Sequence, residues 1–346
     1  MKYMNYKFYT NSEKAWKVMF QSIAQAKESI YLEMYILEDD MPEFNFFKVL
    51  KEKAKQGLRV RLILDSFGSI NLSRNKIIEL QKSGIEIFFL SYLLHRIHRK
   101  VLIIDETVAF IGGVNFHQTA HLWDDLVVQI KGILVVSVVM SFAKSYINSG
   151  GKDPILLGKK SKINISQLKV WIIEHSPIKK HFNLKRIYKK NIDNAKSKIV
   201  IITPYFMPKR WVQADLHQAI LRGVIVEVLV PKYTDYFLID RVNYFYINKL
   251  SKLGITFFLE PKMNHAKAMI IDNDVGIVGS QNLDFLSFDF NSEIGVFFKD
   301  KYVVTKLSGI AENWKKDALT LSYTTYKPKW FDYILSPIVN LFSMMF

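Results

Sequence analysis

The sequence lacks cysteine altogether, and no apolar run in it is long enough to cross a bilayer. Without cysteine, its 346 residues form neither disulfides nor thiolate metal sites, which is compatible with a reducing compartment. The most apolar internal run, Gly132 to Ala143, is well short of the roughly 20 residues that a spanning helix needs, and it predicts a buried helix. Residues 1–10 contain no apolar core of signal-peptide length. The chain is therefore expected not to span a membrane and to approach any membrane from its surface.

Acidic residues are few beside basic ones, with 32 Asp and Glu against 48 Lys and Arg and a formal net charge of +16. This charge favours anionic partners, and both nucleic acid and anionic lipid surfaces are candidates. Lysines scattered over a soluble protein would give the same composition. Hydrophobic residues make up 49% of the chain, which indicates a globular protein rather than a disordered one.

The chain does contain a repeated motif, His-x-Lys-x4-Asp. The first copy is His98, Lys100 and Asp105, and the second is His265, Lys267 and Asp272. Each copy continues through a glycine turn to an asparagine at the same offset, Gly112-Gly113-x-Asn115 in the first and Gly279-Ser280-x-Asn282 in the second. Two copies in register indicate an internal duplication with one active site shared between two halves.

The duplication extends well beyond the motif. Helix-to-strand transitions at 23–35 and 192–205, and glycine-led apolar strands at 57–65, 84–89, 223–231 and 254–259, follow the same order in both halves. This alternation predicts an α/β fold, with a mainly parallel or mixed sheet flanked by helices in each half and a further strand that carries the motif. The expected organisation is a first domain at 1–150, a linker at 151–165, a second domain at 166–326 and an amphipathic C-terminal helix at 327–346. That helix is expected either to lie on a bilayer or to dock on the core.

The residue types of the motif suit phosphate chemistry. Side chains two apart in a strand point to the same side, so His98 and Lys100 are expected to project together, as are their counterparts in the second copy. An ammonium and an asparagine amide would hold phosphate oxygens. One imidazole can attack phosphorus while the other donates and later accepts a proton, without a metal or other cofactor. The aspartates lie an odd number of residues from their histidines, so a structural hydrogen-bonding role suits them better.

A second pair of histidines, His117 and His121, is spaced for chelation on a helix. The sequence supplies no carboxylate or cysteine partners that would complete a convincing metal site. We interpret the pair as surface or capping histidines, and no metal site is predicted.

Together these features resemble the phospholipase D superfamily and, within it, the bacterial cardiolipin synthases. The doubled motif is the superfamily mark, and the surroundings of the motif are similar to the family patterns at Arg96 with 98–100, at 110–115, 203–208, 279–293 and 335–338. The resemblance covers nearly the whole chain from Tyr9 onward, and it implies two phospholipase D-like α-β-α domains related by pseudo-twofold symmetry. Leu286 departs from the pattern, because the family places an arginine there. Many cardiolipin synthases also carry N-terminal membrane helices, whereas this sequence is expected to enter the first domain directly.

The resemblance also implies roles by position. The catalytic set would be the two motifs, with a phosphohistidine intermediate: His98, Lys100, Asp105, His265, Lys267 and Asp272. The substrate-binding set would be Asn115, Asn282, Ser280, Glu293 and Asp125. Within this second set, Glu293 falls where the family places an acid that orients the histidine, and Asp125 is its first-half counterpart.

The expected activity is phosphatidyl transfer between two phosphatidylglycerol molecules, by a peripheral enzyme on the cytoplasmic side of a bacterial membrane. Phospholipid hydrolysis and cleavage of nucleic acid are the alternatives that the same chemistry allows. Superfamily nucleases often carry one motif per chain, so nucleic acid is disfavoured as a partner. A binding protein with inactive sites is disfavoured because both motifs are intact.

Overall fold

The computed structural model describes residues 5–39, 43–90, 95–158 and 169–321. The predicted C-terminal helix at 327–346 and the family-like segment at 335–338 lie outside these residues, as does the later part of the predicted linker. The earlier part of that linker contains a short helix, α5 (Pro154–Leu157). Among the described residues, no helix combines the length and the apolar character needed to cross a membrane.

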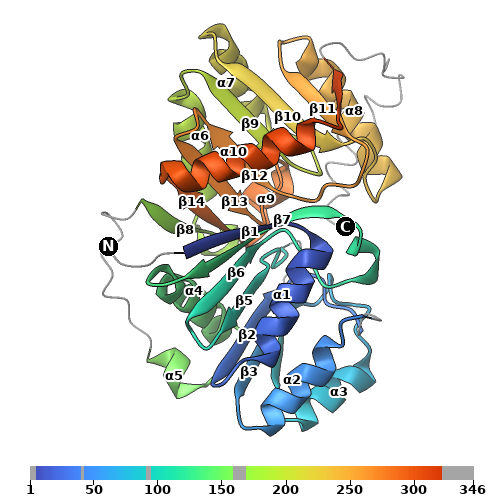
Figure 1. Cartoon of the computed structure of the whole chain (residues 1–346), viewed down its shortest axis with the longest axis vertical. Helices are drawn as coiled ribbons and strands as arrows, with labels where there is room; N and C mark the ends of the chain where they lie inside the picture. Colours follow the sequence, from blue (N-terminus) through green and yellow to red (C-terminus); the bar gives the residue numbers. More distant parts are fainter. Residues whose placement is uncertain (1–4, 40–42, 91–94, 159–168, 322–346) are drawn as a thin grey trace.

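The first half forms a seven-stranded mixed sheet in the order β1-β7-β6-β5-β2-β3-β4 (Figure 1). Strands β2, β3 and β4 run parallel, and the remaining neighbours pair antiparallel. The strands are β1 (Asn5–Asn11), β2 (Ser29–Met34), β3 (Arg59–Asp65), β4 (Glu86–Leu90), β5 (Val101–Ile104), β6 (Val108–Gly112) and β7 (Asp124–Lys131). The helices are α1 (Ser12–Ala24), α2 (Phe46–Lys55), α3 (Arg74–Lys82), the short η1 (Gln118–Ala120) and α4 (Leu134–Asn148).

The second half forms an eight-stranded mixed sheet in the order β15-β11-β10-β9-β12-β13-β14-β8. Apart from the added β15, this order reproduces that of the first sheet, which confirms the predicted duplication and the α/β class. Its strands are β8 (Val170–His175), β9 (Lys198–Ile202), β10 (Ile225–Pro231), β11 (Thr256–Glu260), β12 (Ala268–Ile271), β13 (Val275–Gly279), β14 (Glu293–Phe298) and β15 (Leu319–Leu321). Its helices are η3 (Pro177–Lys179), α6 (Asn183–Asp193), α7 (Arg210–Leu221), α8 (Phe237–Ser251), α9 (Phe285–Asp289) and α10 (Lys301–Lys315).

Four glycines account for the matching helix ends in the two halves. Gly57, Gly84, Gly223 and Gly254 follow α2, α3, α7 and α8, and their φ angles of 90°, 90°, 87° and 98° lie in the left-handed region. Glycine adopts that conformation without a steric penalty, so each helix stops and the chain turns into the next strand. The glycine-led strands predicted from the sequence are all present as β3, β4, β10 and β11.

The edge strands β1 and β8, which open the two halves, were not predicted, and one expectation about strands is wrong. The motif residues do not lie within the motif strands, because β5 begins only after Lys100 and β12 begins only after Lys267. The backbone N–H groups of His98 and His265 bond instead to carbonyls of the opposite half, at Ser292 and Asp124. This pairing keeps the motif segments extended but outside their own sheets.

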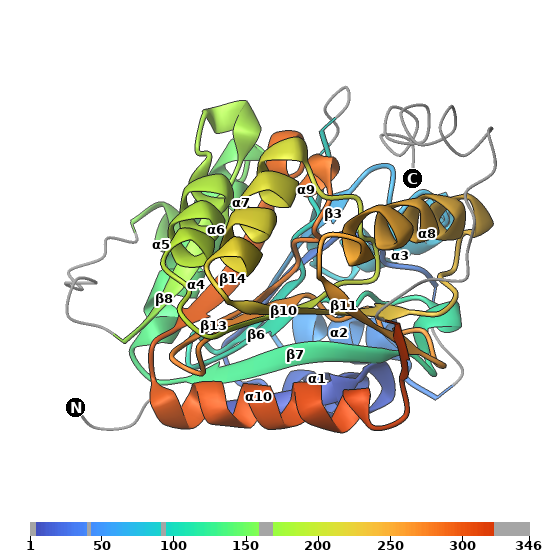
Figure 2. The same ribbon diagram turned by 90° about the horizontal axis from the view of Figure 1, so that it is seen from above.

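A common core joins the two halves. One cluster of buried residues combines inner-face residues of the first sheet, such as Tyr31 and Ile103, with those of the second, such as Ile202 and Ile270. Helices α4 and α10 contribute to the same cluster, and the predicted apolar run 132–143 forms the largely buried start of α4 from Leu134 onward, as a buried helix was predicted. Two further clusters lie under the outer helices, one in each half. Figure 2 shows α10 and α8 on opposite sides of the assembled molecule.

Candidate active site

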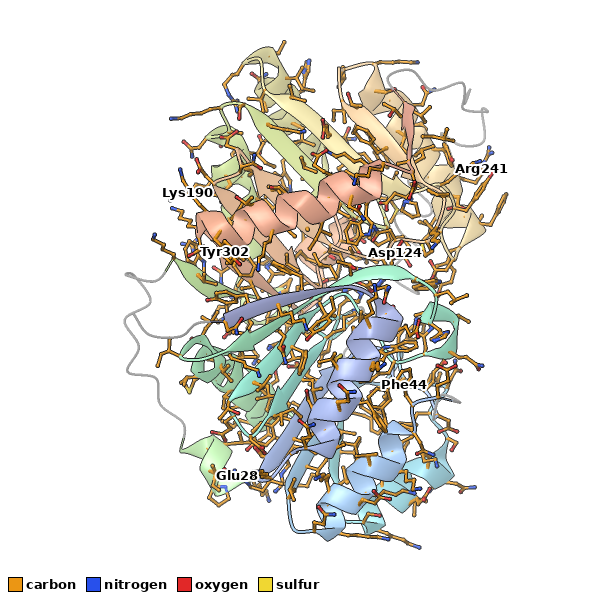
Figure 3. The ribbon with its side chains drawn as sticks, viewed as in Figure 1. Glu28, Phe44, Asp124, Lys190, Arg241 and Tyr302 are labelled. Atoms are coloured by element: carbon orange, nitrogen blue, oxygen red, sulfur yellow. The ribbon has the colours of Figure 1, made fainter. Side chains whose placement is uncertain are left out.

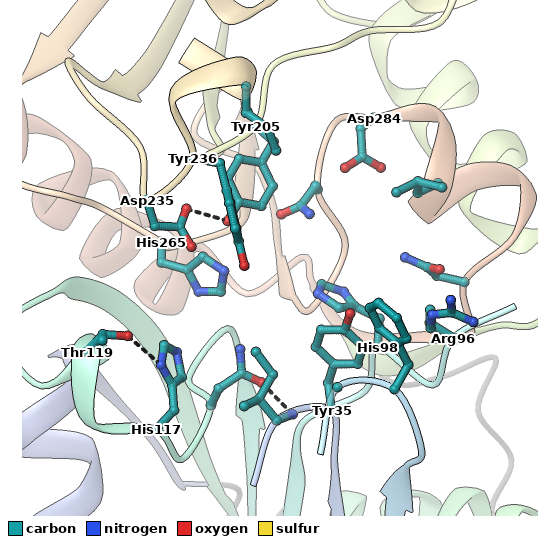
Figure 4. Close-up of a pocket in the computed structure, with 18 of the residues that line it drawn as sticks. Tyr35, Arg96, His98, His117, Thr119, Tyr205, Asp235, Tyr236, His265 and Asp284 are labelled. Atoms are coloured by element: carbon teal, nitrogen blue, oxygen red, sulfur yellow. Dashed lines mark hydrogen bonds between the residues drawn. The ribbon is translucent and has the colours of Figure 1, made fainter. Parts of the chain in front are cut away.

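A pocket of about 650 Å³ opens where the two halves meet (Figure 4). Both motif histidines and both motif asparagines line it, so the structure brings together the two copies that the sequence separates. The wall also includes residues from the loops after β3 and β10 and from the segment around α9. The lining residues include Tyr35, Phe67, Ile70, Arg96, His98, Asn115, His117, Trp123, Tyr205, Tyr236, His265, Asn282 and Leu286.

The first motif histidine is oriented by the second half. Nδ1 of His98 lies 3.0 and 3.1 Å from the two carboxylate oxygens of Glu293, and its backbone N–H donates to the Ser292 carbonyl at 3.0 Å. A carboxylate only accepts hydrogen bonds, so the proton of the neutral imidazole belongs on Nδ1. Nε2 is therefore left with its lone pair toward the pocket.

The second motif histidine is oriented by the first half in the same way. Nδ1 of His265 lies 2.9 Å from Oδ2 of Asp125, and its backbone N–H donates to the Asp124 carbonyl at 2.7 Å. Asp124 lies at the junction of the halves in Figure 3. The two contacts are reciprocal, as pseudo-twofold symmetry requires, and each histidine depends on an acid from the other half.

The two orienting acids differ in their surroundings. Glu293 also accepts hydrogen bonds from the hydroxyls of Ser280 and Ser287, the latter at 2.8 Å. Burial alone would raise the pKa of Glu293, but the neighbouring His98 and Lys100 hold that pKa below its usual value. Asp125 accepts from the N–H of Leu126 at 2.6 Å, and burial raises its pKa to about 6. The ionised form of Glu293, in the second half, is thus better stabilised than that of Asp125 in the first.

Three residues of the predicted substrate-binding set do not form the pocket wall. Ser280 and Glu293 are 0% exposed and Asp125 is 1% exposed, and all three lie behind the histidines. Glu293 and Asp125 contact imidazole rings, and the Ser280 hydroxyl donates to Glu293. The structure therefore places them behind the pocket wall and not in it, because their polar atoms are already engaged inside the protein. An orienting position fits the contacts that they make.

The motif lysines are buried beside the histidines, with Lys100 2% and Lys267 1% exposed. Each ammonium donates to the backbone carbonyl of its own motif histidine, at 2.8 Å for Lys100 and His98. Burial lowers the pKa of Lys267 to about 7 and holds that of Lys100 well below its usual value. Burial also lowers the pKa of His98 to about 4. The pKa of His265 is lowered mainly by burial and further by the positive charges of Lys267 and Lys100. An anionic phosphate in the pocket would reverse these effects, because it favours the protonated forms.

The motif asparagines occupy the wall beside the histidines. Oδ1 of Asn115 accepts from the N–H of Ile36 at 3.3 Å, which leaves its amide NH₂ as a donor. The backbone N–H of Asn282 donates to the Ser287 hydroxyl at 3.0 Å and holds the second asparagine in place. Amide donors on both sides of the pocket suit the oxygens of one phosphate.

The motif aspartates lie at the far ends of β5 and β12 and do not line the pocket. Asp105 accepts hydrogen bonds from the backbone N–H groups of 27–29, and Asp272 accepts from those of 196–198. Both have left-handed φ angles, 50° and 53°. The length of the intervening strand separates them from the histidines, so the structure does not bring them together with the rest of the predicted catalytic set. The structural role inferred from their odd spacing is the one that their contacts support.

A third histidine in the pocket escaped the sequence interpretation. His117 is 8% exposed, its Nδ1 lies 2.7 Å from the Thr119 hydroxyl, and its ring meets that of Trp123 edge-on at 5.2 Å. The interpretation of His117 as a surface or capping residue is therefore wrong. His117 follows Asn115 by two residues in extended chain, where alternate side chains point to the same side. This spacing would have indicated that the His117 side chain points into the pocket as Asn115 does. His121 instead stacks on Trp16 at 5.8 Å, away from the pocket wall.

Leu286 also lines the pocket, so the position where the family has an arginine presents an apolar side chain here. Within the described ranges, the only group of residues with metal-ligand geometry is Glu13, Glu43 and His121, outside the pocket. Two of its three members are exposed acids.

Comparison with known proteins identifies the family. The protein-family model described as "Cardiolipin synthase, PLD-like domain" matches residues 19–143 and 188–314, which include both motifs. The chain belongs to this cardiolipin synthase family of phospholipase D-like enzymes. It is 29% identical to the probable cardiolipin synthase YwiE of Bacillus subtilis and 30% identical to the cardiolipin synthase of Geobacillus sp. strain WCH70. Both matches cover 92% of this chain, and they cover 67% and 68% of the respective relatives.

Solved structures agree on the fold. The phosphatidylserine synthase of Haemophilus influenzae superposes with a TM-score of 0.77 over 98% of this chain and 92% of its own, at 13% sequence identity. At that identity the likeness concerns the fold alone, and it supports the assignment of two phospholipase D-like halves.

Proposed function

We propose that this chain transfers a phosphatidyl group from one phosphatidylglycerol molecule to a hydroxyl of a second, which yields cardiolipin and glycerol. The observation that carries the proposal is the pair of buried imidazoles, His98 and His265, which face one pocket and each hold a carboxylate at Nδ1. Family membership supports the proposal, because relatives named cardiolipin synthase match most of this chain. A net charge of +16 suits an anionic lipid, and we place the enzyme peripherally on the cytoplasmic side of the membrane.

The reaction runs in two steps. In the first, the unprotonated Nε2 of one histidine attacks phosphorus, and a P–N bond forms as the P–O bond to glycerol breaks. The other histidine, in its protonated form, gives its proton to the departing oxygen. In the second step this histidine, now neutral, takes the proton of the acceptor hydroxyl, whose oxygen attacks phosphorus as the P–N bond breaks. Protons and electron pairs balance over the two steps, and the donor and acceptor lipids are the only reactants.

The charged and amide groups around the histidines stabilise the phosphate. Lys100 and Lys267 supply positive charge, and Asn115 and Asn282 supply amide donors. Because burial lowers the pKa of both lysines, an entering phosphodiester anion favours their protonated form. Full positive charge then develops where the substrate is bound, in surroundings from which water is largely excluded.

Incubation of the purified chain with phosphatidylglycerol vesicles, followed by mass spectrometry of the lipids, tests the proposal. The wild type is expected to form cardiolipin, and His98→Ala and His265→Ala are expected to form none, since each lacks one of the two imidazoles. His181→Ala is the matched control, because His181 is exposed and does not line the pocket. Failure of the wild type to form cardiolipin or phosphatidic acid at any lipid composition rejects the proposal. Phosphatidic acid as the main product would favour hydrolysis, in which water takes the place of the acceptor hydroxyl.

A further inference from the structure

Exposed apolar side chains are concentrated at the start of α8, beside the pocket mouth. Tyr233, Tyr236, Phe237 and Leu238 are 63%, 41%, 74% and 46% exposed. Elsewhere in the part of the chain that the structure describes, no stretch of six residues exposes more than two large apolar side chains. Burying apolar surface is favourable. Such a dense group of solvent-exposed apolar side chains therefore indicates a surface that contacts another molecule.

The first half supplies the other side of the same opening. On the loop between β3 and α3, Ile70 is 72% exposed and Phe67 is 39% exposed. Both line the pocket, as Tyr236 does from the second half, so apolar residues flank the mouth on two sides. We call this set the rim patch: Phe67, Ile70, Tyr233, Tyr236, Phe237 and Leu238.

Cationic side chains accompany the rim patch. The guanidinium of Arg96 lies 4.5 Å from the ring centroid of Phe67, and the ammonium of Lys232 lies 5.4 Å from that of Tyr233. Arg241, labelled in Figure 3, follows Phe237 by one helical turn and so shares its side of α8. Asp235, the acid within this stretch, accepts a hydrogen bond from the hydroxyl of a pocket tyrosine at 2.8 Å. Apolar side chains bordered by cations match the chemistry of an anionic lipid surface.

We propose that the rim patch docks on an anionic phospholipid bilayer and holds the pocket mouth against the lipid headgroups. The proposal rests on the proposed function, because that function takes its substrate from a bilayer. A phospholipid places its phosphate in the pocket while its acyl chains remain outside, and the rim residues that line the pocket, Phe67, Ile70 and Tyr236, give those chains a surface to contact. A protein partner seated on the same residues would cover the opening through which the substrate enters. Tyrosine suits the interface in particular, since its ring is apolar and its hydroxyl is polar.

Vesicle co-sedimentation with the full chain tests the docking. Phe237→Glu and Leu238→Glu place a carboxylate at rim positions that do not line the pocket. Each is expected to weaken binding to phosphatidylglycerol vesicles about tenfold or more, the loss that corresponds to one such side chain no longer being buried. The matched controls are Leu221→Glu and Ile225→Glu, whose wild-type residues are 66% and 57% exposed. They lie at the end of α7 and the start of β10, at the end of that strand remote from the pocket, and are expected to bind vesicles as the wild type does.

Turnover of dibutyroyl-phosphatidylglycerol, kept as a soluble monomer, separates docking from chemistry. Phe237→Glu and Leu238→Glu are expected to keep the wild-type rate on this lipid, because their effect is confined to the bilayer. Lack of vesicle binding by the wild type, equal binding by rim and control variants, or an equal loss in all four variants overturns the proposal. Loss of turnover on the soluble lipid by the rim variants overturns it as well. Rim-dependent vesicle binding by a wild type that forms no cardiolipin would reject the proposed function and still support the docking.

Discussion

Nδ1 of His98 lies 3.0 Å from Oε1 of Glu293, a carboxylate that the other half of the chain supplies. His265 and Asp125 make the reciprocal contact at 2.9 Å. Neither half therefore holds a complete histidine–carboxylate pair of its own. Correct packing of the two sheets over their common core is a precondition for orienting either imidazole, so the stability of the fold and the geometry of the site depend on the same interface.

Replacement of Glu293 by glutamine tests the orienting contact. The amide is isosteric but does not enforce the Nδ1–H tautomer, so kcat is expected to fall about 10²–10⁴-fold, as when the acid of a serine-protease triad becomes an amide. KM should change little, since Glu293 does not line the pocket. Cardiolipin formation at several phosphatidylglycerol concentrations gives both constants. Glu312→Gln, which removes an acid paired with Lys315 outside the pocket, is expected to keep the wild-type kcat.

A rise in KM for Glu293→Gln at an unchanged kcat would contradict this role. It would instead place Glu293 in contact with the substrate.

Gly113 and Ser280 occupy equivalent positions in the two halves, yet serine is expected to be tolerated at only one of them. A Cβ atom at Gly113 would lie 2.2 Å from Oδ1 of Asp125 and 2.9 Å from the His265 carbonyl, so Asp125 would have to move away from His265. Gly113→Ser is therefore expected to lower kcat about 10²-fold or more. Ser280→Gly removes a hydroxyl that donates to Glu293, and a loss of about tenfold is expected from one hydrogen bond to a charged group.

Thermal unfolding, measured together with the kinetics, shows whether Gly113→Ser and Ser280→Gly are both folded. Full activity of Gly113→Ser would show that Asp125 is not needed in its present position.

The pocket components were predictable from the sequence, whereas their pairing was not. The repeat identified His98, His265, Asn115 and Asn282, and all four line one pocket. Which acid serves which histidine depends on the packing of two segments far apart in the chain, and periodicity within one half carries no information about that contact. Glu293 was identified through family resemblance, and its assignment to His98 emerges only from the assembled halves.

Local geometry explains the other failures. His98 and Lys100 were expected in a strand, but the N–H of His98 bonds across to the other half, so the strand begins only at Val101. His117 was interpreted as a surface or capping residue because the sequence supplied no partners that would complete a metal site with His121. The structure has extended chain at 117 followed by a short 3₁₀ turn at 118–120, and the two rings pack against different tryptophans, Trp123 for His117 and Trp16 for His121.

Asp105 is expected to support stability and not catalysis. Asp105→Ala leaves the N–H groups of 27–29 without their carboxylate, so the free energy of unfolding should fall by about 1–3 kcal/mol. Asp105→Asn should lose less, since asparagine keeps one acceptor oxygen and tolerates the φ of 50°. Urea unfolding measures the difference, and kcat is measured where both variants remain folded. A large fall in kcat at unchanged stability would return Asp105 to the catalytic set.

Glu260 provides a prediction about pH. Burial raises the pKa of Glu260 to about 8 from its usual value of 4.5, and its Oε2 accepts from Nδ2 of Asn264 at 2.8 Å. Asn264 in turn accepts from the N–H of Ala266 at 2.9 Å, next to the motif histidine. Between pH 4.5 and 8 the folded state holds a proton that the unfolded state has released, so this residue makes stability fall as pH rises.

Glu260→Gln removes that titration and keeps an oxygen for Asn264. Relative to the wild type, the variant is expected to gain about 2–4 kcal/mol in free energy of unfolding between pH 5 and pH 8, as the folded-state shift requires. Urea unfolding of both proteins at the two pH values measures this change, and the difference between them cancels titrations common to both. Asn264→Ala is expected to destabilise at both pH values, because it deprives Ala266 of its acceptor whatever the charge of Glu260. An equal effect of Glu260→Gln at pH 5 and pH 8 would mean that Glu260 is already ionised in the folded protein at pH 5.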